Sequence, residues 1–384
     1  MHPSHDLTIP LSVLDLSPVP PGGTGADGLR DSVALAQAAE AAGYRRYWVA
    51  EHHLTPGVAS ASTPVLAGLI AGATRTIRVG SGAVQMPMTP PLQVAEQFGT
   101  VAAIHPGRVD LGLGRFDIHK ILTMISERAK PAGEVPPPPP SKWVDGLLLP
   151  SPGRVPGVDL SGFAVLGERM GISGDDPAPD HRAQVREILS YLEGTATRDD
   201  GTPLHAPAAE GADLEFWMLG SSPGVSAQTA GELGLPFAVN YHTIPTTVLD
   251  TVDAYRAAFT PSAHRDRPYV MVSADVVVAP TDEAAAELAA PYGQWVLDIR
   301  TGRGAQPYVT PEQARARPWS EDERAGVADR VDTQFVGAPA TVVAGLETLV
   351  KATGADELLV TTITTDHVDR VRSHELLAEA WAAR

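Results

Sequence analysis

The residues with the clearest potential for chemistry are a carboxylate and two imidazoles that stand next to one another. Glu51, His52 and His53 directly follow a short apolar run at 46–50. An imidazole titrates near neutrality, so one of these histidines could act as a general base or stabilise a developing anion. A metal site is the main alternative, but adjacent histidines seldom bind one ion and no HExxH spacing is present, so no metal is predicted. Two loop histidines satisfied by their neighbours are the purely structural alternative.

A second cluster has the composition of a phosphate site. Gly220, Ser221 and Ser222, followed by Ser226, would place hydroxyl groups and free backbone amides at the start of a helix. Arg115 could reach the same anion, since the glycines at 112 and 114 allow close approach of the backbone. Serine is also a common helix cap where no ligand binds, so the pattern alone leaves both interpretations open.

Another glycine-containing segment excludes a different cofactor. Gly80-Ser81-Gly82 follows an apolar run, as a dinucleotide-binding loop would, but Gln85 stands where the third glycine is needed. We therefore reject a nicotinamide fingerprint.

All these residues follow short apolar runs that alternate with Ala-rich helical runs, which is typical of a parallel sheet wrapped by helices. A helix-Gly-strand join recurs at Gly43, Gly234 and Gly354. Eight units spread over the whole chain predict one (β/α)8 TIM barrel for residues 1–384, with an open doubly wound sheet as the alternative. The expected strands are 11–16, 46–50, 77–84, 108–114, 215–219, 236–240, 269–278 and 357–362.

In such a barrel the active site lies at the carboxyl ends of the strands, so the two clusters would meet there. Asp15 after the first strand, and Tyr241 and His242 after the sixth, would join them.

Two segments interrupt the alternation of strands and helices. Residues 116–180 are rich in proline, including the run 136–140, and are predicted to form an insertion after the fourth strand. Either a mobile surface loop or a lid over the barrel mouth would fit. The next helix is expected at 181–192, and a second irregular region at 301–329.

Composition narrows the class of partner. Lys and Arg number 29 and Asp and Glu 46, giving a formal charge of −17, which repels nucleic acid and anionic lipid. The absence of cysteine excludes disulfides and thiolate chemistry and fits a reducing cytoplasm. No stretch has the roughly 20 apolar residues of a membrane span, and no signal sequence is recognisable at the N-terminus. A cytoplasmic protein is therefore expected, without nucleic-acid or membrane partners.

Taken together, the motifs resemble those of the bacterial-luciferase-like flavin monooxygenases. The similarity is clearest over residues 11–115 and extends over 181–384. The segments that carry it are Leu11-Ser-Val-Leu-Asp15, Tyr47-Trp-Val-Ala-Glu-His-His53, Val79-Gly-Ser-Gly82, Val94-Ala-Glu-Gln-Phe98, Pro106-Gly-Arg-Val-Asp-Leu-Gly-Leu-Gly-Arg115, Leu219-Gly-Ser-Ser222 and Gly354-Ala-Asp-Glu-Leu-Leu-Val360.

This resemblance implies a barrel, usually a homodimer, that takes reduced FMN from a separate flavin reductase. Dioxygen would then form a flavin hydroperoxide that oxygenates a small organic substrate, for example in a tailoring step of secondary metabolism. Carried over by position, His52 would be catalytic and Glu51 would line the flavin site. The cofactor-binding residues would be Arg115, Gly220, Ser221, Ser222, Ser226, Asp15 and Ser81, and the substrate pocket would include His53, Tyr241 and His242.

The chain departs from the family pattern directly after Arg115, where Phe116-Asp117-Ile118 leads into the proline-rich segment. No second phosphate-binding arginine can be assigned there. Two alternatives remain: a deazaflavin-dependent dehydrogenase of the same superfamily, and a non-catalytic flavin-binding barrel. The Glu51-His52-His53 pattern favours the FMN enzyme.

Overall fold

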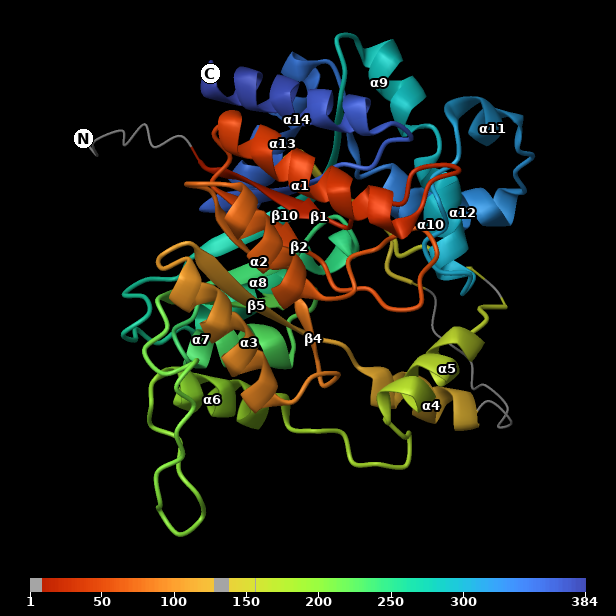
Figure 1. Cartoon of the computed structure of the whole chain (residues 1–384). Helices are drawn as coiled ribbons and strands as arrows, with labels where there is room; N and C mark the ends of the chain where they lie inside the picture. Colours follow the sequence, from red (N-terminus) through yellow and green to blue (C-terminus); the bar gives the residue numbers. More distant parts are fainter. Residues whose placement is uncertain (1–8, 128–137, 156) are drawn as a thin grey trace.

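The computed structural model describes residues 9–127, 138–155 and 157–384 and contains a closed barrel of parallel strands (Figure 1). Pairing of strand β9 with β10, and of β12 with β1, closes the ring, so the predicted (β/α)8 barrel is confirmed and the open sheet is excluded. The eight barrel strands, in the order in which they pair, are β1 (Leu11–Asp15), β2 (Arg46–Val49), β3 (Arg78–Ser81), β5 (Val109–Arg115), β8 (Leu214–Gly220), β9 (Phe237–Asn240), β10 (Val270–Val278) and β12 (Glu357–Thr361).

Helices surround this barrel and connect its strands. Gly43, Gly234 and Gly354 have φ values of 84°, 62° and 60°, so each recurrent helix-Gly-strand join uses the left-handed conformation that glycine adopts without penalty. The surrounding helices are α1 (Gly25–Ala41), α2 (Thr63–Ala73), α3 (Pro91–Ile104), α6 (His181–Leu192), α7 (Val225–Glu232), α8 (Val248–Ala258), α13 (Pro339–Thr353) and α14 (His367–Ala382). Within the described ranges, no helix combines the length and apolar character needed to cross a membrane.

Alternate strand residues enter two different apolar cores. Val13 and Tyr47 pack in the core shared with the surrounding helices, whereas Leu14 and Trp48 pack in the barrel interior. This follows from the two-residue period of a strand, which sends successive side chains to opposite faces. The parity of a residue in its strand therefore decides whether its side chain can reach a site inside the barrel.

The predicted third strand, 77–84, is two strands in the structure. β3 ends at Ser81 and pairs with the start of β5, while β4 (Val84–Met86) pairs with its end. The intervening Gly82 and Ala83 line the barrel mouth. A single continuous strand is therefore wrong here, because the chain leaves the sheet just where the barrel opens.

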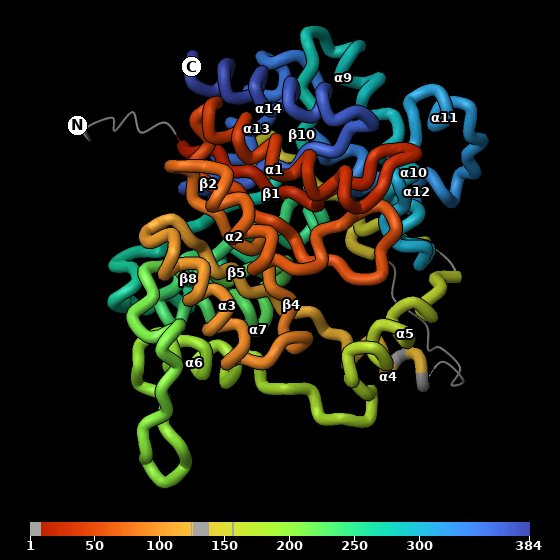
Figure 2. Tube along the Cα trace, in the orientation of Figure 1, coloured from red at the N-terminus to blue at the C-terminus, as the bar shows by residue number. Residues whose placement is uncertain are grey.

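The segment 116–180 has more structure than predicted. It contains α4 (Ile118–Glu127), α5 (Ser161–Met170) and a hairpin of β6 (Lys142–Val144) and β7 (Leu147–Leu149). α4 and α5 pack against each other to one side of the barrel (Figure 2). Part of the proline run, residues 136 and 137, lies outside the described residues.

The region 301–329, predicted to be irregular, contains further helices. α11 (Pro311–Ala316) and α12 (Glu321–Val331) each begin with a capping box, Thr310 with Gln313 and Ser320 with Glu323. Those spacings were visible in the sequence and would have predicted both helix starts. The elements around them are the 3-10 turn η1 (Pro245–Thr247), α9 (Asp282–Ala289), α10 (Tyr292–Arg300) and β11 (Phe335–Gly337).

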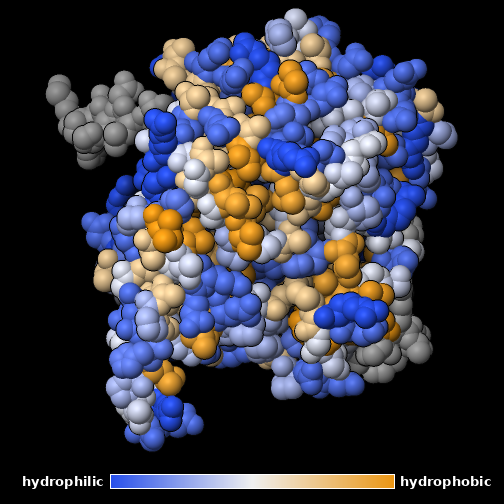
Figure 3. Space-filling view, in the orientation of Figure 1, coloured by the Kyte–Doolittle hydropathy of each residue, from blue (hydrophilic) through white to orange (hydrophobic). Residues whose placement is uncertain are grey.

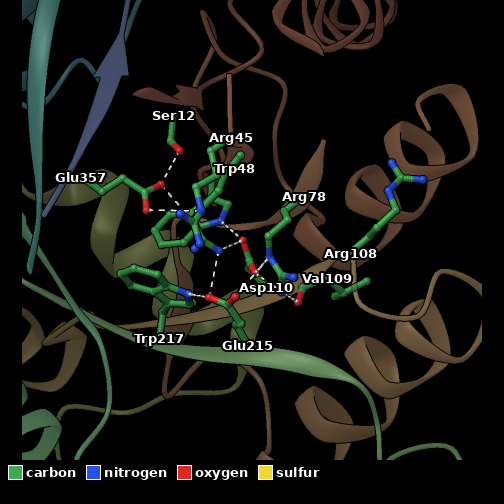
Figure 4. A network of polar contacts seen from close by, with 12 residues as sticks. Ser12, Arg45, Trp48, Arg78, Arg108, Val109, Asp110, Glu215, Trp217 and Glu357 are labelled. Carbon is green, nitrogen blue, oxygen red and sulfur yellow. Dashed lines mark hydrogen bonds and ion pairs between the residues drawn. The ribbon is translucent and has the colours of Figure 1, made fainter. Parts of the chain in front are cut away.

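The amino end of the barrel is filled by a buried ionic network (Figure 4). Arg46, which is fully buried, contacts Asp110 at 2.9 Å, Glu357 at 2.9 Å and Glu215 at 3.0 Å. Arg78 adds a second contact to Asp110 at 2.7 Å. Because each carboxylate in this interior has a cationic partner, the network closes this end of the barrel.

Candidate functional site

A cavity of about 320 Å³ opens at the carboxyl ends of the barrel strands. This position agrees with the general location of active sites in (β/α)8 barrels. The predicted site residues that line the cavity are Glu51, His52, Arg115, Gly220, Ser221 and His242. The structure thus brings together residues that are up to 191 positions apart in the chain, the separation of Glu51 and His242.

The loop after β2 is held in place through Glu51. Its Oε1 lies 2.9 Å from His53 Nε2, and Gln85 Nε2 donates to the Glu51 carbonyl at 2.6 Å. Gln85 N also donates to Glu51 Oε2 at 3.3 Å. His53 therefore supports the carboxylate from outside the cavity, which corrects its predicted place in the substrate pocket.

His52 contributes an imidazole to the cavity wall. Its Nδ1 is buried and has no hydrogen-bond partner among the described residues. Burial, with a smaller contribution from His53, lowers the pKa of His52 to about 4. The ring is consequently neutral at pH 7, with one nitrogen able to accept a proton and the other able to donate a hydrogen bond. The pKa of His52 is therefore lower than the value near neutrality that was expected from the sequence.

The predicted phosphate residues follow β5 and β8, which are two and three strands from β2 in the ring. Arg115 ends β5, is 40% exposed and lies 3.0 Å from Asp117 Oδ2. Ser221 lines the cavity and Ser226 is buried in the first turn of α7, but Ser222 is exposed and does not line the cavity. The backbone amides at the start of α7 and the Arg115 guanidinium are the donors that suit a phosphate.

His181 is a residue of this region that the sequence analysis missed. It begins α6, it is 5% exposed, and both of its ring nitrogens are buried without a partner among the described residues. Burial and the nearby charge of Arg115 lower the pKa of His181 to about 4. The available signal was the Asp180 cap, whose Oδ1 accepts hydrogen bonds from Arg182 N and Ala183 N and fixes the start of the helix.

Three further predicted residues, Asp15, Ser81 and Tyr241, lie outside the cavity. Asp15 is buried against Arg370 at 3.0 Å and accepts a hydrogen bond from Tyr47 Oη at 2.7 Å. Ser81 Oγ bonds to Gly112, which joins β3 to β5, and Tyr241 Oη donates to the Leu148 carbonyl of the β6–β7 hairpin. Strand parity explains why Asp15 and Tyr241 lie outside the cavity. The side chains that face inward belong to their neighbours in the chain, Leu14, Asn240 and His242.

A polar group that was not predicted lies deeper in the same cavity. Asp275 of β10 and Arg330 of α12 both line it, and Tyr292 Oη donates to Asp275. Arg330 Nη2 donates to Tyr292 Oη at 2.8 Å. His242 is near this group, since burial and the charge of Arg330 lower its pKa, and its Nδ1 lies 2.5 Å from Ser273 Oγ. Across the described chain, no three His, Asp or Glu side chains are arranged to hold a metal ion.

Comparison with known proteins identifies the family. The model of the luciferase-like monooxygenases matches residues 9–131 and 152–357. This chain belongs to the luciferase-like monooxygenase family. It is 39% identical to the Bacillus subtilis protein YvbT, with 97% of each chain covered. It is 35% identical to a protein of Escherichia coli strain K12 named luciferase-like monooxygenase, covering 97% of this chain and 96% of that one.

Solved structures agree with this assignment. Apo-MsnO8 matches 99% of both chains with 31% identity and a TM-score of 0.77. The FMN complex of the oxygenating constituent of 3,6-diketocamphane monooxygenase from Pseudomonas putida has the same fold, with 18% identity, a TM-score of 0.66 and coverage of 98% and 99%. An F420-dependent secondary alcohol dehydrogenase also has this fold, with 16% identity, a TM-score of 0.60 and coverage of 97% and 99%. The protein is thus an enzyme of a monooxygenase family whose structural relatives bind flavin or deazaflavin.

Proposed function

We propose that the protein is an FMN-dependent monooxygenase that receives reduced FMN from a separate reductase and oxygenates a small organic substrate with dioxygen. The observation that carries this proposal is the cavity itself, which combines a phosphate-binding rim at Arg115 with the neutral imidazole of His52. The FMN-bound relative with the same fold supports the choice of cofactor. A tailoring step in secondary metabolism in the cytoplasm remains the setting we propose.

The residues present fit the phosphate of FMN. Arg115 supplies a cation, α7 supplies unpaired backbone amides, and His181 supplies a buried imidazole that lacks a partner in the described chain. A side chain at Gly220 would be tight, since an added Cβ would lie 3.0 Å from the Phe237 ring. The backbone there is consequently bare and open to a ligand.

Reduced FMN, when bound, would supply two electrons to dioxygen, so that one oxygen atom enters the substrate and the other leaves as water. The neutral ring of His52 can accept a proton on one nitrogen and donate a hydrogen bond from the other at the cavity wall. Glu51, fixed by Gln85 and His53, would hold the loop after β2 in place beside the cofactor. The chain's own contribution is therefore to bind, orient and shield the cofactor.

Stopped-flow absorbance after mixing dioxygenated buffer with the anaerobic protein and reduced FMN tests this proposal. We expect reoxidation slower than in free solution, passing through a species that absorbs in the near ultraviolet and is not oxidised FMN. Reoxidation at the rate of free flavin would contradict it and favour the deazaflavin-dependent dehydrogenase or the non-catalytic barrel.

The phosphate-binding rim is tested by direct titration of reduced FMN. Arg115→Ala should weaken binding by about 1–3 kcal/mol, because a charge-assisted contact is lost. Arg169→Ala is a matched control, since its side chain is 72% exposed on α5. Equal affinities for the wild type and Arg115→Ala would place the phosphate elsewhere.

The homodimer is also part of this proposal. Val65 and Leu69 lie one turn apart on α2 and are 61% and 62% exposed. Figure 3 shows apolar side chains gathered over the middle of this face, where α1 and α2 lie in Figure 1. Light scattering after gel filtration should give twice the chain mass, and Leu69→Glu should shift the protein to monomer. A wild-type monomer would contradict the proposal.

A further inference from the structure

The cavity contains more unpaired polar atoms than the cofactor phosphate explains. Among the described residues, three buried side-chain atoms without a hydrogen-bond partner belong to its lining: His52 Nδ1, Arg330 Nε and Thr361 Oγ1. Buried polar atoms in proteins are almost always paired, so such a concentration in one cavity indicates a place where a ligand supplies the partners. Two of the three residues are linked through Asp275, since Thr361 is its register partner in the sheet and Arg330 Nη2 lies 3.5 Å from its Oδ2.

Arg330 is held rigidly with its Nε unpaired. The residue is 7% exposed, and its guanidinium lies 5.4 Å from the Tyr292 ring centroid and 5.7 Å from that of Trp295. Nη2 donates to Tyr292 Oη at 2.8 Å and lies 3.5 Å from Asp275 Oδ2. Because these contacts use Nη2, the Nε side of the guanidinium keeps its capacity to donate.

The charge of Arg330 is only weakly balanced. Among the described residues a single carboxylate, Asp275, lies near it at 3.5 Å, and burial raises the pKa of that carboxyl group. Arg46, which is fully buried, has three carboxylates within 3.0 Å. A buried guanidinium with so little compensation has room for a further anionic acceptor, and a planar carboxylate matches its geometry.

Arg330 lies apart from the phosphate-binding rim. Arg115 ends β5, whereas Thr361 ends β12, and these strands are four steps apart in a closed ring of eight. They therefore lie on opposite walls of the barrel. Leu14, Trp295 and Ile363 add apolar surface to the cavity.

We propose that Arg330 Nε, together with Thr361 Oγ1, binds the carboxylate of the substrate, so that the enzyme acts on organic acids with an apolar body. That the acid is oxygenated rests on the proposed function, whereas the binding of the acid does not. The acid would be anchored on the β12 wall, and its apolar part would extend across the cavity toward His52 and the cofactor.

Isothermal titration of the purified protein, with and without oxidised FMN, tests the carboxylate site. Octanoate and phenylacetate should each bind about tenfold or more tightly than octanamide and phenylacetamide, which keep the shape but lose the charge. Arg330→Gln should reduce acid binding to the level of the amides. Arg324→Gln, an exposed position on the same helix, should leave acid binding unchanged.

Further variants separate this site from the others. Arg330→Lys should keep part of the acid preference if Arg330→Gln fails to fold, and Thr361→Val should weaken acid binding without removing a charge. Arg115→Ala should leave octanoate affinity unchanged. Loss of octanoate binding in Arg115→Ala would instead place the acid on the phosphate-binding rim and overturn the inference.

Two results would refute the inference in the unaltered protein. Equal affinity for acids and amides, or no measurable binding of either acid, would mean that Arg330 and Asp275 form only a structural pair. Failure of the monooxygenase proposal gives a different result. If flavin reoxidised at its free rate in the stopped-flow experiment, the protein would still bind acids more tightly than amides.

Discussion

The two ends of the barrel each contain a buried arginine, but the two arginines differ in how many carboxylates surround them. At the amino end Arg46 is surrounded by three carboxylates, and its guanidinium lies 4.8 Å from the Trp217 ring centroid. At the carboxyl end Arg330 also lies over aromatic rings, yet among the described residues it has one carboxylate, at 3.5 Å. Each guanidinium keeps one buried nitrogen without a partner in the described residues, Nη2 of Arg46 and Nε of Arg330, so the two ends differ in how fully the protein compensates the charge.

This difference separates stability from function in physical terms. A buried charge whose partners all come from the protein rigidifies the fold, and its removal leaves the partners uncompensated. A buried charge that the protein compensates only in part costs stability, and such a cost is typical of sites that bind ligands. The amino end of this barrel has the properties of a structural plug, and the carboxyl end has those of a binding site.

Replacing the two arginines should give the largest effect. Arg46→Met should lower the free energy of unfolding by about 3–5 kcal/mol, because several carboxylates lose their buried partner. Arg330→Met should cost less, since it removes the cationic partner of one carboxyl group, Asp275, whose pKa burial already raises. Urea unfolding followed by circular dichroism measures both, with the half-exposed Arg45→Met as control. Equal losses of unfolding free energy in Arg46→Met and Arg330→Met would show that the two ends do not differ in this way.

Removing a single hydroxyl at each end sharpens the comparison. Tyr269 Oη donates to Glu357 Oε2 at 2.8 Å, so Tyr269→Phe should lower the free energy of unfolding by about 1.5–3 kcal/mol, as expected for a hydrogen bond to a charged group. Tyr308 Oη is buried without a partner in the described residues, so Tyr308→Phe should leave stability unchanged or raise it. A larger loss for Tyr308→Phe in the same urea experiment would show that this hydroxyl has a partner.

Acid should destabilise the carboxyl end through its histidines. Burial lowers the pKa of His242 to about 3, below the value near 6.5 expected in the unfolded chain. As the pH falls below 6.5, the unfolded state gains a proton that the folded state does not. Stability is therefore lost on acidification, with a slope of up to about 1.4 kcal/mol per pH unit from this residue. Unfolding at pH 7, 6 and 5 should show a shallower slope for His242→Gln, and an unchanged slope would contradict the assignment.

The barrel could be predicted from the sequence because its signals are local. Short apolar runs gave the eight barrel strands, although the run at 77–84 proved to be divided, and the glycines at 43, 234 and 354 marked the recurrent joins. Glu51 and His52 were found because they directly follow a strand, where loop residues reach the barrel mouth. Asp15 and Tyr241 were misplaced because strand parity was not applied to them.

The polar group formed by Asp275, Tyr292 and Arg330 escaped prediction for a different reason. Asp275 lies inside a nine-residue strand rather than after its end, and Arg330 belongs to a helix in a region predicted to be irregular. Neither residue stands near the other in the sequence, so only the packing of α12 against the barrel reveals the pair. His181 was missed similarly, since its link to Arg115 exists only in three dimensions.

The described residues of the insertion after β5 include two parts that differ in how they are joined to the barrel. α4 and α5, which flank the hairpin in the chain, pack against each other, and Phe116 of the cavity lining contacts Phe163 of α5. The β6–β7 hairpin is joined to the barrel by hydrogen bonds, because Leu148 and Pro150 accept from Tyr241 and Thr246. A chimera that carries a foreign hairpin would have to bring the β9 loop with it, and that loop includes His242 of the cavity wall.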